Sequence, residues 1–291
     1  MTLSRTTWQQ IDPPGRYFIK MQGLRNHFVI VDGREDPYHP GRSEIVHICD
    51  PQTGVGGDQL VIIEPPSPEG EKSGAYAFMR LLNVDGRDVE ACGNATRCIA
   101  WLLMQESGVD ALKIETRAGV LECQREGDML ISCMMGKISM DWQKIPLSRQ
   151  QDTLHLDIEV EELSDPVGLN IGNPHAVFFV DDLDSIDLQR LAPSVQENKL
   201  FPEEVNVGLA QMIDAENMRL VVYERGAGLT TACGSGACVA VFAAIARGLT
   251  KSHTLTVLMP AGPVNIEIRA DDTAVMTGPV DFCFTGHLPK E

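Results

Sequence analysis

Two short stretches of this chain have nearly the same sequence. Residues 91–98 read ACGNATRC and residues 232–238 read ACGSGAC, and each places a cysteine and a glycine directly before an apolar run of helical length. The N-terminus of a helix exposes unpaired N–H groups and carries partial positive charge. It lowers the pKa of a neighbouring thiol and attracts anions. Because Cys92 and Cys233 lie 141 positions apart in a chain of 291 residues, the repeat predicts two similar halves, each contributing one reactive thiol.

A weaker repetition supports this division into halves. Residues 26–29 (NHFV) resemble residues 173–177 (NPHAV), and residues 54–56 (GVG) loosely echo residues 206–208 (NVG). We therefore expect a first domain over residues 1–136 and a second over residues 137–278. No low-complexity linker separates them, so the two domains are expected to pack closely.

Composition excludes several classes of partner. The net charge of −17 argues against nucleic acid and against an anionic membrane surface, because both need clustered Lys and Arg. No apolar run approaches the roughly 18 residues of a membrane span, and residues 1–16 lack the apolar core of a signal peptide. The eight cysteines are scattered, which indicates reduced thiols and a cytoplasmic protein.

Most of the chain has the pattern of short strands, and three segments have that of helices. The helices are expected over 93–106, over 235–247 and over 182–197, the second apolar nearly all round and the third amphipathic and exposed. The expected strands are 17–21, 28–32, 59–63, 76–82, 112–116, 120–124, 129–134, 154–160, 176–180, 218–223, 255–259, 264–268 and 282–285. This pattern predicts an α+β protein in which each half wraps a sheet around its helix.

The cysteines differ in their expected roles. Cys92 and Cys233 are the catalytic candidates, because both share the helix-start context. Cys98 and Cys238 point to other faces of the same helices and are expected in the core. Cys49, Cys123, Cys133 and Cys283 lack such a context and are expected to be structural. None of these spacings is of the Cys-x2-Cys type, which argues against zinc.

Several polar residues near the second cysteine turn are ambiguous from the residues alone. Arg225 could hold a carboxylate bidentately and Glu224 could bind an ammonium, but a charged pair at a strand end is often a surface ion pair. His175 fits a core histidine and a functional one equally well. Asn83 and Asn206 fit ordinary turn residues as well as ligands.

The chain resembles the diaminopimelate epimerase family from about Tyr17 to its C-terminus. Seven stretches carry the resemblance, in the family's order: 21–28 (MQGLRNHF), 54–59 (GVGGDQ), 83–86 (NVDG) with 89–94 (VEACGN), 172–175 (GNPH), 201–208 (FPEEVNVG), 223–228 (YERGAG) and 232–236 (ACGSG). The sequence differs from the usual family pattern at Arg25 and His27, where Gly and Asp are usual, and at Leu229, where an acidic residue is common. Residues 1–16 are additional.

The resemblance implies two pseudo-symmetric domains, each a strongly curved and mostly antiparallel sheet around a central helix, with the last strand, from about residue 279, returning to the first domain. It implies epimerisation of LL- and meso-2,6-diaminopimelate without pyridoxal phosphate or metal, with Cys92 and Cys233 as acid/base thiols, His175 near the chemistry and Glu224 on the α-ammonium. The resemblance also implies a set of residues that bind the rest of the substrate: Asn26, Gln59, Asn83, Gly93, Asn94, Asn173, Asn206, Arg225, Gly234 and Ser235.

Two other functions remain open from the sequence. The first is a racemase or epimerase of the same fold that acts on a different amino acid, which a panel of amino acids would distinguish. The second is a cysteine-rich metal or redox protein that binds without turnover, which elemental analysis would detect. The sequence is compatible with a homodimer but does not specify an oligomeric state.

Overall fold

The computed structural model describes residues 15–90 and 92–289, and the chain divides into two compact units. The first comprises the described parts of Met1–Arg125 and Val280–Glu291, and the second is Glu126–Pro279. The chain therefore passes from the first unit to the second after residue 125 and returns to the first after residue 279. The sequence leads us to expect these two transitions near residues 136 and 278.

The first unit is one curved sheet with helix α4 (Gly93–Ser107) against it. In order of pairing its strands are β19 (Asp281–His287), β1 (Tyr17–Gly23), β2 (Asn26–Asp32), β3 (Gln59–Glu64), β4 (Ala75–Asn83), β6 (Ala111–Thr116) and β7 (Gly119–Gly127). The short β5 (Asp88–Val89) also pairs with β4. Two further helices are α2 (Arg42–Cys49) and α3 (Pro68–Lys72).

The second unit contains a sheet built on the same plan around helix α6 (Gly234–Ala246). In order of pairing its strands are β11 (Val167–Asn170), β12 (Pro174–Phe179), β13 (Asn206–Met212), β14 (Asn217–Glu224), β16 (Thr254–Met259), β17 (Gly262–Ile268), β18 (Thr273–Pro279) and β8 (Leu130–Lys137). The short β15 (Gly228–Thr230) pairs with β14. The remaining elements are β9 (Glu159–Val160), β10 (Leu163–Ser164), the 3-10 turn η1 (Leu183–Ser185) and α5 (Leu188–Gln196).

The two sheets repeat one pattern of strand directions. From β1 to β7, and again from β11 to β17, successive pairs run antiparallel, parallel, antiparallel, parallel and antiparallel. The register of the parallel pairs shows which residues of the two sheets are equivalent. Phe28 lies opposite Gln59 in the β2–β3 pair, and His175 lies opposite Asn206 in the β12–β13 pair. Gln59 is thus the equivalent of Asn206, so the expected match between residues 54–56 and 206–208 is wrong. The match between Asn26 and Asn173 agrees with this register.

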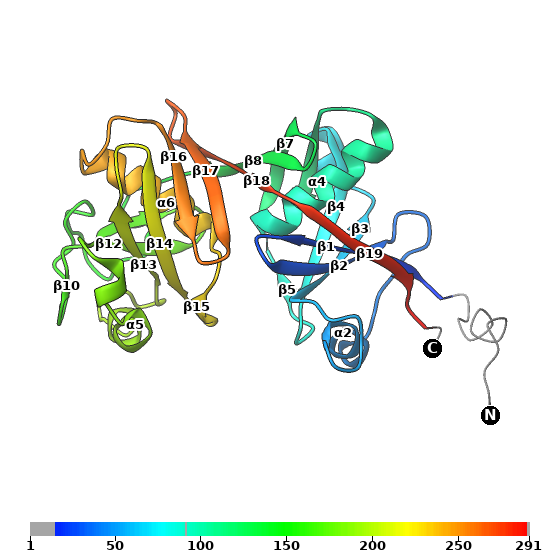
Figure 1. Cartoon of the computed structure of the whole chain (residues 1–291), viewed down its shortest axis with the longest axis horizontal. Coiled ribbons are helices and arrows are strands. Elements are labelled where there is room, and N and C mark those ends of the chain that lie inside the picture. The colour runs from blue at the N-terminus through cyan, green and yellow to red at the C-terminus, as the bar shows by residue number, and fades with distance from the viewer. Residues whose placement is uncertain (1–14, 91, 290–291) are drawn as a thin grey trace. The chain divides into compact units, whose positions relative to one another are not determined.

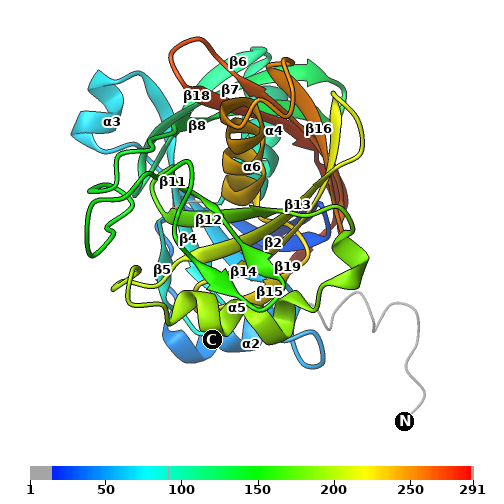
Figure 2. The ribbon, with the colours of Figure 1, turned by 90° about the vertical axis from the view of Figure 1, so that its left-hand side faces the viewer.

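Helix α6 lies at the centre of its unit. It contacts β11, β12, β13, β14, β16, β17 and β18, and Figure 2 shows these strands arranged around it. Its side chains are buried on several faces, among them Cys238, Val239 and Val241, which are almost inaccessible to solvent. This position explains why its sequence is apolar nearly all round. In the first unit α4, labelled in Figure 1, packs against β1 and β6.

The structure differs from the sequence expectations at several elements. Of the strand expected over 154–160, only Glu159–Val160 is extended. The helix expected over 182–197 is two pieces, because Asp182 caps η1 and Asp187 caps α5 separately, through Asp184 N and Arg190 N. The pattern missed β11, β13 and β18, as well as the short helices α2 and α3. The first five residues of β13 are all buried, so its sequence lacks the alternation by which a half-exposed strand is recognised.

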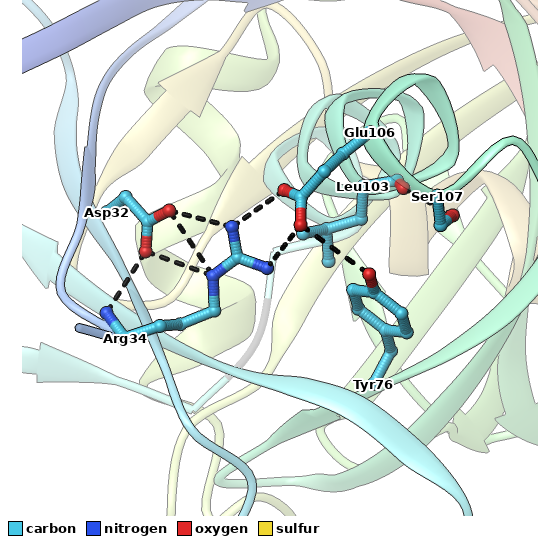
Figure 3. Close-up of polar contacts among 6 residues, drawn as sticks. All are labelled: Asp32, Arg34, Tyr76, Leu103, Glu106 and Ser107. Carbon is cyan, nitrogen blue, oxygen red and sulfur yellow. Dashed lines mark hydrogen bonds and ion pairs between the residues drawn. The ribbon is translucent and has the colours of Figure 1, made fainter.

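A cluster of ionic contacts ties the C-terminal end of α4 to the sheet (Figure 3). Arg34 donates to both carboxylate oxygens of Asp32, and its Nη1 and Nη2 donate to Glu106 at 3.0 and 2.7 Å. Tyr76 adds a hydroxyl contact to Glu106 at 3.5 Å. Partial burial opposes ionisation of Asp32, but the hydrogen bonds and charge of Arg34 outweigh burial, and the pKa of Asp32 is lowered.

We expect Arg34→Met to lower the free energy of unfolding at neutral pH by about 1 kcal/mol, because both carboxylates are half-exposed and partly screened. Arg117→Met, which removes a single exposed pair with Asp88, is the matched control and should cost less. The pKa of Asp32 is lower in the folded protein than in the unfolded chain, where it is about 4. The stabilisation that ionised Asp32 provides is therefore fully present above the unfolded pKa and is lost as the pH falls through the folded pKa. Urea unfolding at neutral and acidic pH measures both effects, and a pH-independent difference would contradict this account.

Candidate active site

Cys92 occupies the N-cap position of α4, with extended backbone at φ −145° and ψ 116°. Its carbonyl oxygen accepts hydrogen bonds from the backbone N and the hydroxyl of Thr96, both at 2.9 Å. Its thiol is half-buried and donates to Asn26 Oδ1 at 3.6 Å. The expected helix start, with Gly93 and Asn94 in its first turn, is therefore present.

The polar residues expected in the first half lie together at one end of three neighbouring strands of its sheet. Asn26 begins β2, Gln59 begins β3 and Asn83 ends β4. Gln59 Nε2 donates to Asn83 Oδ1 at 3.0 Å, and Asn94 Nδ2 donates to Asn26 Oδ1 at 3.5 Å. The parallel β2–β3 pair and the antiparallel β3–β4 pair bring these strand ends together, which the separate motifs in the sequence do not reveal.

Cys233 is the N-cap of α6, the position equivalent to that of Cys92. Burial raises the pKa of its thiol and the charge of Glu224 raises it further, whereas the Ser235 hydroxyl and the Gly236 backbone N–H act in the opposite direction. The Sγ–Ser235 Oγ distance is 3.5 Å. The two thiols thus share a backbone position but differ in surroundings.

A chain of hydrogen bonds joins the polar residues expected in the second half. Asn173 contacts Ser235 Oγ at 3.4 Å through Nδ2, and its Oδ1 lies 3.0 Å from His175 Nε2. The same ring nitrogen lies 3.4 Å from Asn206 Nδ2, and Asn206 Oδ1 accepts from the backbone N of Arg225 at 2.8 Å. Residues of β12, β13 and α6 and the residue that follows β14 are thereby brought together.

His175 is fully buried. Burial, together with the charge of Arg225, lowers its pKa to about 3, so its imidazole is neutral at physiological pH. Its described partners are side-chain amides, whereas a core histidine was expected to bond to backbone. In a neutral ring Nε2 can either donate to Asn173 Oδ1 or accept from Asn206 Nδ2, so the tautomer decides which of the two amides His175 orients.

The charged pair at the end of β14 has local partners. Glu224 Oε1 accepts from the hydroxyl of Thr230 at 2.5 Å, and Arg225 Nη1 donates to the carbonyl of Glu203 at 2.8 Å. The pair is therefore held by β15 and by the loop before β13, and Glu224 lies close enough to Cys233 to influence its thiol.

We expect Glu224→Gln to lower the pKa of Cys233, because removal of a nearby negative charge favours the thiolate. Ser235→Ala should have the opposite effect, because it removes a hydroxyl that stabilises the thiolate. Site-resolved alkylation by iodoacetamide at fixed pH should then be faster in the first variant and slower in the second. Equal changes of the same sign in both variants would argue against this electrostatic account.

The structure adds three residues that the sequence alone did not single out. Asp58 accepts from Asn26, Arg97 donates to Asn94, and Thr230 donates to Glu224. Asp58 lies inside the family-matching stretch 54–59, and Arg97 lies inside the first cysteine stretch, 91–98, where a charged residue within the apolar helix pattern was the available signal. The other cysteines also have defined places: Cys98 and Cys238 are buried as expected, Cys49, Cys123 and Cys133 are buried, and Cys283 is exposed on β19, so Cys283 is not a core residue.

The atypical residues lie at a turn, at the start of a strand and on an exposed strand. Leu24 and Arg25 form the two-residue turn between β1 and β2 with φ of 54° and 59°, a conformation that glycine adopts more easily. The backbone N of His27 donates to Asp58 at 2.7 Å. Leu229 is exposed on β15.

Within the described residues, no helix is long and apolar enough to span a membrane. The same residues contain no group of three or more His, Cys, Asp or Glu side chains arranged to hold a metal ion.

Comparison with known proteins agrees with this arrangement. The family model described as diaminopimelate epimerase matches residues 18–140 and 167–283. The chain belongs to the diaminopimelate epimerase family. Among curated members of this family, that of Phenylobacterium zucineum is 45% identical over 94% of this chain and 98% of its own length. That of Rhodospirillum centenum is 43% identical over 94% of this chain and 93% of its own length.

Solved structures with low sequence identity share the fold of this diaminopimelate epimerase family member. A Bacillus anthracis phenazine biosynthesis protein of the PhzF family matches with a TM-score of 0.67 at 16% identity, over 96% of this chain and 100% of that chain. A hydroxyproline epimerase from Agrobacterium vitis matches with a TM-score of 0.64 at 13% identity, over 94% and 92%. These likenesses confirm the expected α+β fold of two strand-rich halves.

Proposed function

We propose that this chain interconverts LL- and meso-2,6-diaminopimelate by moving a proton between the α-carbon and two thiols, those of Cys92 and Cys233. The family to which it belongs makes it an isomerase that acts on a small molecule. The observation that carries the proposed mechanism is the duplication. Each half places one cysteine at the N-cap of its helix, at equivalent positions of two sheets with the same strand pattern.

The helix starts supply the chemistry that such a reaction needs. An amino-acid α-proton is weakly acidic, and negative charge spreads onto the α-carboxylate as the proton leaves. Backbone N–H groups at Gly93, Asn94, Gly234 and Ser235 are suited to stabilise that charge. Glu224 would hold the α-ammonium. Asn26, Gln59, Asn83, Asn173, Asn206 and Arg225 would bind the remainder of the substrate.

One thiol must be ionised and the other protonated when substrate binds. The thiolate removes the α-proton, and the thiol delivers its proton to the opposite face of the carbon, so each stereoisomer uses the cysteines in opposite roles. The two groups then titrate as a coupled pair. Reduced cysteines are required, and the cytosol maintains them. We propose the cytosol as the compartment and a homodimer as the assembly, the latter testable by light scattering.

The mechanism predicts where solvent hydrogen appears. With LL-diaminopimelate in deuterated water, early product should carry deuterium at the new stereocentre, because the delivering thiol exchanges with solvent between turnovers. Remaining substrate should stay unlabelled at low conversion. Proton NMR of both pools at low conversion measures this.

Label in unreacted substrate at the same stage would contradict the two-thiol mechanism while leaving epimerase activity established. No turnover of LL-diaminopimelate, together with turnover of another amino acid in a substrate panel, would overturn the proposed substrate.

A further inference from the structure

The amide of Asn26 is held in one orientation by Asp58. Asp58 Oδ2 accepts from Asn26 Nδ2 at 3.1 Å and from the backbone N of His27 at 2.7 Å. A carboxylate oxygen that receives two N–H groups can pair only with the NH2 end of the amide. The carbonyl end, Oδ1, is therefore turned away from Asp58, toward the start of α4.

The amide of Asn94 is held in the same way from the opposite side. Arg97 is fully buried, and its Nη2 donates to Asn94 Oδ1 at 2.7 Å. A guanidinium only donates, so it fixes the carbonyl end of Asn94. Asn94 Nδ2 is then left to donate to Asn26 Oδ1, at 3.5 Å.

The four side chains form a chain of hydrogen bonds in which every donor points the same way. Arg97 donates to Asn94, Asn94 donates to Asn26, and Asn26 donates to Asp58. Because its ends are a donor-only and an acceptor-only group, neither amide can turn over without placing like groups together. The thiol of Cys92 meets this chain of hydrogen bonds at Asn26 Oδ1, 3.6 Å away, where only a protonated sulfur can form a hydrogen bond.

We propose that Asp58 and Arg97 are positioning residues that hold Asn26 with its carbonyl oxygen toward Cys92, so that the free enzyme favours the protonated thiol at this position. The inference rests on the proposed function only in taking Cys92 as a reacting group. In the second unit the equivalent asparagine is held the other way round, since Asn173 directs Nδ2 toward Ser235. The orientation of each asparagine amide is therefore set by the side chains around it and not by the backbone position that the two asparagines share.

The test measures the alkylation rate of Cys92 by iodoacetamide without substrate at fixed pH, resolved by peptide mass spectrometry because the chain has eight cysteines. Asp58→Ala should raise the rate about tenfold, because Asn26 can then turn its NH2 group toward sulfur and stabilise the thiolate. Asp58→Asn should leave the rate within about twofold of wild type, because one acceptor oxygen serves both bonds of Asp58.

A double-mutant cycle separates positioning from general loosening of the structure. In an Asn26→Ala background, Asp58→Ala should change the rate by less than about twofold, because its effect passes through Asn26. Asp50→Ala is the matched control, since Asp50 accepts two hydrogen bonds in the preceding loop and should not alter Cys92. If Asp58→Ala does not fold, Asp58→Leu, which fills the same space without an acceptor, is measured in the same cycle with Asn26→Ala. Adding Arg97→Met to either variant should raise the rate further, because Asn94 can then turn together with Asn26, whereas adding Arg97→Lys should not.

An unchanged rate in Asp58→Ala, or an equal increase with and without Asn26, would overturn the proposal. A failure of the proposed function would appear separately, as absence of turnover in the wild-type enzyme.

Discussion

Cys92→Ala and Cys233→Ala should each lower the rate of diaminopimelate epimerisation by about a thousandfold or more, with the protein still folded. In the proposed mechanism each thiol serves one face of the α-carbon, and alanine offers no group that can take up or deliver a proton. The residual rate in both directions is measured by following the two stereoisomers by chromatography, with circular dichroism to verify folding.

Cys98→Ala and Cys238→Ala are the matched controls, because these buried cysteines lie in the same two helices. They should lose stability through a small cavity and retain most of the activity. If Cys92→Ala or Cys233→Ala kept more than a few per cent of wild-type activity, the assignment of two reacting thiols would be wrong.

Gly236→Ala should be the most damaging single-methyl change near the second thiol. Alanine in place of glycine normally stabilises a helix by about 1 kcal/mol. Here a Cβ would lie 2.8 Å from Val222 Cγ2 and 3.2 Å from Cys233 Sγ. Such overpacking costs about 1–3 kcal/mol, and displacement of the sulfur by about 1 Å would lower turnover about a hundredfold.

Thermal unfolding and steady-state kinetics on the same samples measure both effects. Gly41→Ala is the control, since a Cβ there meets nothing within 4 Å. A Gly236→Ala variant as stable and as active as wild type would show that the first turn of α6 tolerates the added methyl group.

The parts of this fold that sequence predicts are those with local signals. Helices α4 and α6 each begin at a cysteine–glycine pair and continue as an apolar run, so their starts were predicted to within one residue. Strand β13 was missed because its first five residues are buried, and the division of residues 182–197 into η1 and α5 depends on two separate aspartate caps. The equivalence of Gln59 and Asn206 comes from strand register, which pairs residues distant in the chain.

The residues of the candidate site also fall into those that the sequence predicts and those that only the structure reveals. Cys92 and Cys233 could be chosen as the proposed reacting thiols from the repeat alone, and the full set of proposed substrate-binding residues only through the family resemblance. The roles of Asp58 and Arg97 required the structure, because they depend on hydrogen bonds between side chains that the fold brings together. His175 needed it too, since its neutral state follows from burial and from Arg225, neither of which can be read from its neighbours in sequence.

The pairing of β19 with β1 also bears on the order in which the molecule can assemble. Tyr17 lies opposite His287 in this pair, so the first unit takes in residues from both ends of the described chain, whereas the second is one continuous segment. On a ribosome, the strands of the second unit have all been synthesised before the last strand of the first exists. The edge of β1 that faces β19 therefore stays unpaired until β19 has been synthesised, although β2 can already pair with the other edge.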